Sequence, residues 1–149
     1  MSASALFARE LGAIDRIVEF TAEAFAQEGI EPDLRTVVDL ALEELFTNVI
    51  KYGRPSEKPV RIELARIANG VQGTIVVEDA ERYDPTARPE VDVRRPIEER
   101  TPGGLGIHLV RRMMDSFEYR YSDESREARM TFRKTLAGAG AQGGQDARD

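Results

Sequence analysis

The segment from Asp39 to Gly53 restricts the fold most, because its pattern predicts one helix with two distinct arcs of side chains. The first arc is apolar and predicts a core stripe made of Val38, Leu42, Leu45, Val49 and Tyr52. The second arc lies directly beside it and carries a carboxylate, an amide and an ammonium group, on Glu44, Asn48 and Lys51. Polar groups along the edge of a buried face are expected in a pocket wall. The alternative is an ordinary amphipathic helix with Glu44 and Lys51 in solvent.

A second stretch, Thr101 to Asp115, places three glycines at the start of a strongly apolar helix. These are Gly103, Gly104 and Gly106. Glycines let backbone N–H groups approach an anion closely, and a helix N-terminus adds partial positive charge. A glycine cluster alone is a weak indication of phosphate binding, but its combination with an E-x-x-x-N helix is a much stronger one.

Two motifs occur together in the sequence, E-E-L-F-T-N-V-I-K-Y-G and P-G-G-L-G-I-H-L-V-R-R-M-M-D. On these two motifs, the sequence resembles the anti-sigma-factor serine kinases. That family belongs to a superfamily of ATP-binding domains that also includes histidine kinases, gyrase B, the Hsp90 chaperone and MutL. The resemblance covers about residues 5 to 135. It therefore extends over nearly the whole chain apart from its C-terminal tail.

Composition limits the other classes of function. With 149 residues and 41% hydrophobic content, the chain predicts one domain with a single core. A net charge of −6 argues against a nucleic-acid binder. The absence of cysteine and the single histidine exclude disulfides, a cysteine nucleophile and a multi-histidine zinc site. No signal peptide or membrane-spanning run is evident, so we expect a cytoplasmic protein.

The order of expected elements predicts an α+β fold, a two-layer α/β sandwich with a mainly antiparallel or mixed sheet and helices on one face. We expect helices over 5–28, 32–52 and within 101–115, and strands over 60–66, 73–79, 117–121 and 128–134. A short strand over 5–9, before the first helix, is left open. Residues 1–136 form the expected domain, and 137–149 are expected to be a disordered tail. The resemblance implies the same architecture.

Residues 80–102 form a long, polar connection that carries four prolines and charges of both signs. Connections of this length in a compact domain are usually functional lids or disordered segments. A nucleotide lid and a flexible insertion remain equal alternatives.

The resemblance implies that the protein binds ATP with Mg²⁺ and assigns a role to each polar residue of the two helices. Asn48 would supply an oxygen ligand to the magnesium ion, and Glu44, one helical turn earlier, would be the general base. Gly103, Gly104 and Gly106 would present backbone N–H groups to the phosphates. Lys51 could reach the phosphates as a point charge, although a solvated lysine is the alternative.

The chain departs from the family pattern where the adenine would be bound. The family has Asp-x-Gly after the second hairpin strand, followed by an aromatic residue and Asp-Pro. Alignment on Tyr83-Asp84-Pro85 places Glu78 at the aspartate and Ala80 at the glycine. The Cβ of Ala80 would then stand where the backbone needs close approach or a positive φ. Asp79 is an alternative with a one-residue shift, although alternation would point it to the face opposite Glu78. We therefore expect adenine recognition to be weakened or rearranged.

Two further residues need assignments. Thr131 matches a threonine that often lies near the adenine in this superfamily, and a cross-strand structural role is the alternative. His108 is interpreted as a packed or pocket-edge residue rather than as a phosphate acceptor, because the sequence shows no separate dimerisation helix.

The resemblance implies an anti-sigma regulatory factor with ATP-dependent serine kinase activity toward an anti-sigma-factor antagonist protein. Its partners would be a sigma factor and that antagonist, with a homodimer also allowed and no direct contact with nucleic acid or membrane. A partner-switching module that binds no nucleotide is the main alternative. The ATPase part of a larger two-component machine is a third, less favoured one.

Overall fold

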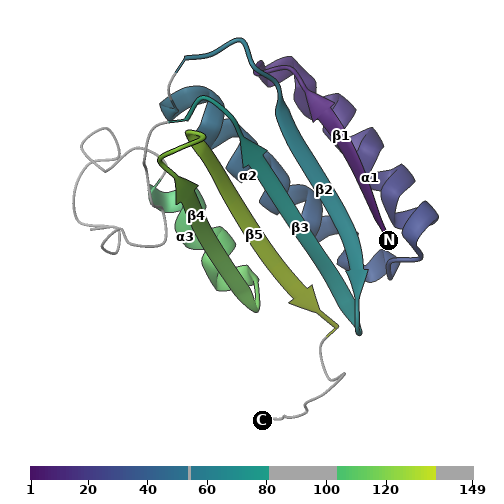
Figure 1. Ribbon diagram of the computed structural model, residues 1–149. Coiled ribbons are helices and arrows are strands. Elements are labelled where there is room, and N and C mark those ends of the chain that lie inside the picture. The colour runs from purple at the N-terminus through teal and green to yellow at the C-terminus, as the bar shows by residue number, and fades with distance from the viewer. Residues whose placement is uncertain (54, 81–103, 137–149) are drawn as a thin grey trace.

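The computed structural model describes residues 1–53, 55–80 and 104–136, and Figure 1 shows these as a sheet with helices on one of its faces. The side chains of 104–107 are not described. The elements in chain order are β1 (Ser2–Phe7), η1 (Leu11–Ala13), α1 (Ile14–Glu28), η2 (Pro32–Leu34), α2 (Arg35–Tyr52), β2 (Val60–Ile67), β3 (Gly70–Val77), α3 (Gly104–Met113), β4 (Ser116–Ser122) and β5 (Glu127–Thr135).

The five described strands form one sheet in the order β1-β2-β3-β5-β4, and every neighbouring pair is antiparallel. The predicted α+β two-layer sandwich is therefore confirmed. The parallel pairing that a mixed sheet would need does not occur among these strands. The predicted connection over 80–102 lies outside the described residues except for Ala80, and the predicted tail over 137–149 lies outside them entirely.

Strand alternation assigns one face of the sheet to the core. Val60, Ile62 and Leu64 of β2 are fully buried against the helices, as their apolar period predicts. Their partners on β3 are Val77, Ile75 and Gly73. Gly73 pairs in turn with Phe132 of β5, whose ring covers the glycine so closely that an added Cβ would overlap it.

The first helix is shorter than predicted, because residues 2–7 form the edge strand β1 instead. Ala3 pairs with Leu64 and Phe7 with Val60, and both are buried. The helical spacing of this segment is overridden by pairing with a strand far along the chain. The strand suggested over 5–9 exists but begins at Ser2 and ends at Phe7. The predicted stop of the helix is confirmed, since Gly29 caps α1 with φ 68°.

The helix α2 buries most of its predicted stripe. Val38, Leu42 and Leu45 are fully buried, and Val49 is partly buried. Tyr52 is 52% exposed, so its placement in the core was wrong: the buried stripe ends before the last turn of α2. The predicted start at Pro32 is the 3₁₀ turn η2, which continues directly into α2.

Candidate functional site

The ends of several elements meet at one end of the sheet (Figure 1). Val77, at the end of β3, pairs with Val60 at the start of β2 and with Ala128 near the start of β5. Because α2 leads into β2, its last turns reach this end. The helix α3 leads into β4, and β4 begins at the opposite end of the sheet. The last turn of α3 therefore lies at that opposite end, and its first turn lies near the end of β3. The topology thus brings together the segments that the sequence singled out.

The polar arc of α2 is partly drawn into the protein. Glu44 and Asn48 are partly buried, and the Oδ1 atom of Asn48 is buried. Lys51 is exposed in the last turn, as the solvated alternative predicts. A carboxylate and an amide oxygen therefore lie one helical turn apart at the edge of the core rather than on an open surface.

These donors fit a magnesium nucleotide. Mg²⁺ takes oxygen ligands, and in nucleotide sites the protein supplies only one or two of them while phosphates and water supply the rest. Among the described residues there is no group of three or more histidine, aspartate or glutamate side chains that would enclose a metal ion by itself. The amide oxygen of Asn48 is suited to a cation shared with a ligand's phosphates, and the carboxylate of Glu44, one turn away, is suited to accept a proton.

The glycine-opened helix is present, and α3 begins at Gly104, so Gly104 and Gly106 lie in its first turn. Gly103 lies outside the described residues. The helix packs against α2, which carries Glu44 and Asn48. Backbone N–H groups at the start of α3 have no partner within their own helix and are therefore available to bind an anion. His108 is partly buried on α3, as expected for a packed or pocket-edge residue.

The structure does not bring Glu78 to the helix-covered face. Val77 faces the core, so Glu78 is out of phase with it along the strand. The Glu78 side chain is 51% exposed, and its carboxylate lies 3.7 Å from Lys58 Nζ. The assignment of Glu78 as the adenine-contacting carboxylate stays a prediction, at a half-exposed position beside Lys58.

Asp79 is the better-placed carboxylate. It lies two residues beyond the end of β3, is partly buried, and has a left-handed backbone with φ 54°. If the alternation of β3 is continued past its last residue, Val77, Asp79 falls on the helix-covered side and Glu78 on the other. The hairpin register that pairs Val77 with the core residue Val60 is the signal that could have identified Asp79 from sequence.

Ala80 does not adopt the positive φ that was one of the two expectations for this position. The described non-glycine residues with positive φ are Asn69, Asp79 and Arg126, so the left-handed position is Asp79, a residue type that tolerates it. Ala80 is 7% exposed. Its N–H donates to the Arg126 carbonyl over 2.8 Å, and its carbonyl accepts from the Tyr121 hydroxyl over 3.0 Å. The alanine methyl group is therefore part of a packed, hydrogen-bonded segment.

Thr131 lies on the other face of the sheet. Its neighbours along β5, Met130 and Phe132, are buried against the helices, and alternation turns Thr131 away from them. It pairs with Thr74 and Glu118 across the strands. A place for Thr131 near the adenine stays a prediction, and its position also matches the cross-strand alternative.

Arg9 is a residue of this site that sequence reasoning missed. It lies between β1 and η1, and its guanidinium reaches the segment at the end of β3. Burial lowers the pKa of Arg9 below its ordinary value, while the nearby carboxylates of Asp79 and Glu78 act in the opposite direction. No short motif marks this residue in the sequence.

A separate groove of about 510 Å³ lies at the opposite end of the sheet. Its lining includes Gly29, Arg66, Asn69 and Leu136, near the turn between β2 and β3. It is therefore distinct from the end that carries Asn48 and Asp79. In the part of the chain that the structure describes, no helix has the length and apolar character needed to cross a membrane.

Comparison with known proteins gives a consistent result. The family model of the histidine kinase-like ATPase domain matches residues 7–132. The serine/threonine-protein kinase BtrW of Bordetella bronchiseptica is 25% identical over 91 residues, which are 60% of this chain and 64% of BtrW. The chain thus spans less than two thirds of that relative. The solved structure of the RsbU and RsbW domains of Rv1364c from Mycobacterium tuberculosis has a TM-score of 0.61 at 11% identity, covering 91% of this chain and 32% of that one. At this identity the likeness concerns the fold alone.

Proposed function

The chain belongs to the histidine kinase-like ATPase domain family, and on this premise we propose that it is an anti-sigma regulatory factor with ATP-dependent protein serine kinase activity. The observation that carries the proposal is the pair Glu44 and Asn48, partly buried one helical turn apart beside the glycine-opened α3. The relative named as a serine/threonine-protein kinase supports the choice of reaction.

The proposed reaction is transfer of the γ-phosphoryl group of ATP to a serine hydroxyl. The bond from the γ-phosphorus to the β,γ-bridging oxygen breaks while a bond to the serine oxygen forms, which leaves ADP and phosphoserine. Glu44 accepts the hydroxyl proton as general base. A bound Mg²⁺ would supply charge neutralisation at the phosphates, with Asn48 as a protein oxygen ligand. The start of α3, with Gly104 and Gly106 and by extension Gly103, would hold the phosphates through backbone N–H groups.

Base recognition is assigned to Asp79 rather than to Glu78. A carboxylate on the helix-covered side of the sheet can accept a hydrogen bond from the exocyclic amino group of adenine. Ala80, buried beside it, would pack against the base. Lys51 would contribute at most a long-range charge, since it is exposed in the last turn of α2.

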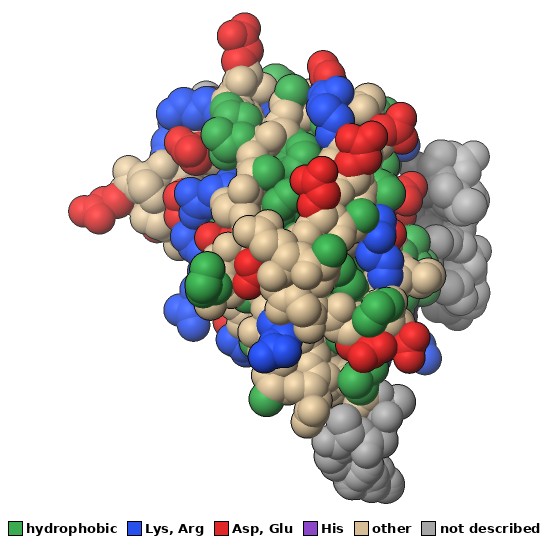
Figure 2. Space-filling view, turned by 90° about the vertical axis from the view of Figure 1, so that its right-hand side faces the viewer, with side chains coloured by type: hydrophobic (Ala, Val, Ile, Leu, Met, Phe, Trp, Pro, Cys, Tyr) green, Lys and Arg blue, Asp and Glu red, His purple; other side chains and the backbone are tan. Residues whose placement is uncertain are grey.

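The proposed partners are proteins: a sigma factor that is sequestered and an anti-sigma-factor antagonist that is phosphorylated. The face shown in Figure 2 carries acidic and basic side chains interspersed, rather than the continuous basic patch of a nucleic-acid binder. A homodimer is compatible with the proposal.

A second candidate is a partner-switching module that binds its regulators without nucleotide. The observation that favours it is the loss of the usual Asp-x-Gly spacing at Glu78–Ala80. Such a module would keep the fold but show no phosphate transfer.

Equilibrium titration with ATP in the presence of Mg²⁺ separates the two candidates. The kinase proposal predicts a Kd in the micromolar range, which corresponds to a binding free energy on the order of −8 kcal/mol. A folded protein with no detectable binding would exclude the kinase and leave the nucleotide-independent module. Phosphate transfer is then tested with γ-labelled ATP and purified candidate antagonist proteins.

A further inference from the structure

One guanidinium group joins the ends of three strands. Arg9 follows β1, and its Nε donates to the carbonyl of Lys58, just before β2, over 2.7 Å. Its Nη2 donates to the carbonyl of Glu78, just after β3. These contacts lie beyond Phe7, Val60 and Val77, which form the last paired row of the three strands. Arg9 therefore extends the link between the strands past the point where backbone pairing ends.

The segment Glu78–Ala80 is held from two sides. Arg9 binds the Glu78 carbonyl from the β1 side. On the other side, the carbonyl of Arg126 and the hydroxyl of Tyr121 engage the N–H and the carbonyl of Ala80, over 2.8 Å and 3.0 Å. Asp79 lies between these anchor points. Its left-handed backbone, with φ 54°, is thus fixed by contacts on both neighbouring residues.

The charges around Arg9 favour an interaction with Asp79. The carboxylates of Asp79 and Glu78 both interact electrostatically with the guanidinium. Glu78 also has Lys58 Nζ at 3.7 Å, on the exposed side of the segment. A guanidinium fixed at two carbonyls is a rigid, permanently charged neighbour for the carboxylate of Asp79.

We propose that Arg9 is a positioning residue for base recognition, which holds the backbone of Glu78 and orients the Asp79 carboxylate toward the amino group of an adenine nucleotide. This inference rests on the proposed function. An oriented carboxylate loses less conformational freedom when it binds the base. Arg9 therefore raises the affinity for the base although Arg9 itself does not contact the base.

A purely structural role would have a different signature. If Arg9 only tied the strands together, its removal would weaken binding of every ligand at this end of the sheet equally. The proposal instead restricts the effect to ligands that contain the base. Comparison of Mg²⁺-ADP with Mg²⁺-pyrophosphate, which has phosphates but no base, therefore separates the two roles.

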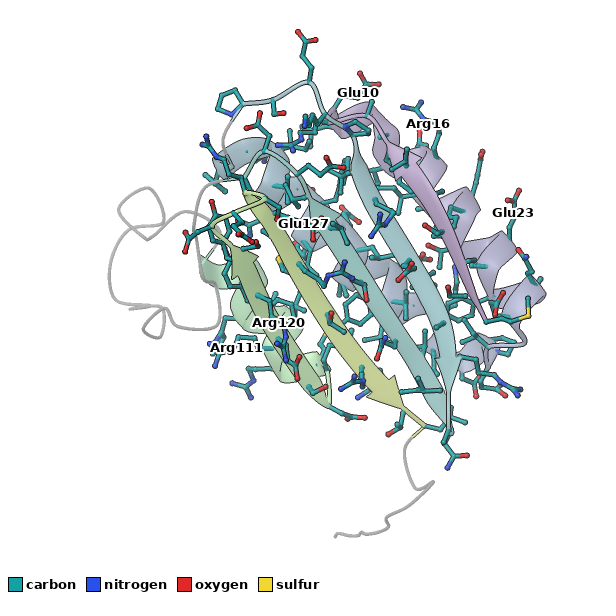
Figure 3. All side chains as sticks on the ribbon, in the orientation of Figure 1. Glu10, Arg16, Glu23, Arg111, Arg120 and Glu127 are labelled. Atoms are coloured by element: carbon teal, nitrogen blue, oxygen red, sulfur yellow. The ribbon has the colours of Figure 1, made fainter. Side chains whose placement is uncertain are left out.

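The test uses Arg9→Met, which keeps much of the aliphatic length but removes the charge and the donors. Arg16→Met is the matched control, because Arg16 pairs with Glu10 over 3.2 Å on the exposed surface nearby (Figure 3). We expect Arg9→Met to weaken ADP binding by at least about tenfold and pyrophosphate binding by less than about twofold. Arg16→Met should change neither by more than about twofold. Unchanged ADP affinity in folded Arg9→Met, or an equal loss for pyrophosphate, would overturn the proposal.

Amide hydrogen exchange gives a readout that needs no nucleotide. In Arg9→Met, the Ala80 amide should lose protection by at least about tenfold while amides of central β3 keep theirs, because the segment is released on one side. Arg16→Met should leave the Ala80 amide unchanged. Unaltered protection in Arg9→Met would overturn the positioning role even if the wild-type protein bound no ADP. Lost protection in a protein that binds no ADP would instead refute the proposed kinase and leave the anchoring by Arg9 intact.

Discussion

Val77 pairs with Val60 across the β2–β3 ladder, and this pair is the last before the two carboxylates that follow β3. Val60 and Val77 are both buried against the helices, so alternation continued past Val77 would assign Asp79 to the core side and Glu78 to the other side. The site can therefore retain a carboxylate that binds the adenine, although the residues after β3 do not match the Asp-x-Gly pattern of the family.

Substitution of the two carboxylates should separate their roles. Asp79→Asn keeps the size of the side chain and tolerates the left-handed backbone, but it removes the negative charge and replaces one of the two acceptor oxygens with a donor. We expect ATP affinity to fall by at least about tenfold, whereas Glu78→Gln should change it by less than about threefold. Both affinities are measured by calorimetric titration with Mg²⁺ present. The reverse order of effects would return the role to Glu78.

Glu44 should matter for phosphate transfer and not for nucleotide binding. In Glu44→Gln the general base is lost while the shape of the side chain stays, so transfer should fall by at least about a hundredfold with ATP affinity nearly unchanged. The control is Glu43→Gln, which removes the same charge from the adjacent, exposed position of α2. Transfer is followed with γ-labelled ATP and any antagonist protein that the wild type phosphorylates. Full transfer by Glu44→Gln would remove this residue as the base.

The contact between Gly73 and Phe132 predicts a stability effect. A methyl group on Gly73 would overlap the buried Phe132 ring, so Gly73→Ala should lower the free energy of unfolding by about 1–3 kcal/mol. Gly12→Ala is the control, since an added Cβ there meets no atom within 4 Å. Urea denaturation monitored by circular dichroism measures both. Equal stability of the two variants would show that the sheet and the ring move apart without penalty.

A side-chain clamp at Asp115 fixes the segment between α3 and β4 against the end of β5. The Oδ2 atom of Asp115 accepts from the backbone N–H of Thr135 over 2.8 Å and from its hydroxyl over 2.7 Å. Asp115→Ala removes both bonds and should lower the free energy of unfolding by about 1–3 kcal/mol. Thr135→Val removes only the hydroxyl bond and should have roughly half that effect. A larger loss in Thr135→Val than in Asp115→Ala would contradict the clamp.

Much of the fold could be predicted because its signals are local. The alternation in 60–66 and the Asn69-Gly70 turn predicted the β2–β3 hairpin, and Asn69 does adopt a positive φ of 58°. Residues 2–7 could not be assigned in the same way. Their own pattern allows a helix or a strand, and only pairing with β2, far along the chain, decides for the strand.

The residues of the candidate site that lie on one helix could be predicted from the sequence. The residue that joins the site through tertiary contacts could not. Glu44 and Asn48 share an arc of α2, so their spacing alone brought them together. Arg9 acts through backbone carbonyls that lie 49 and 69 residues away in sequence. Carbonyl acceptors belong to every residue, so no residue pattern could have indicated these contacts.

The most direct test of the account is the Mg²⁺ dependence of ATP affinity in the wild type and in Asn48→Ala, measured by calorimetry with Mg²⁺ or with EDTA. Gln27→Ala, an exposed amide on α1, is the control. If Asn48 is a ligand to a nucleotide-bound Mg²⁺, removal of Mg²⁺ should weaken ATP binding at least about tenfold in the wild type and in Gln27→Ala, but by less than about threefold in Asn48→Ala. An equal Mg²⁺ dependence in all three proteins would contradict a magnesium nucleotide site on this face of α2.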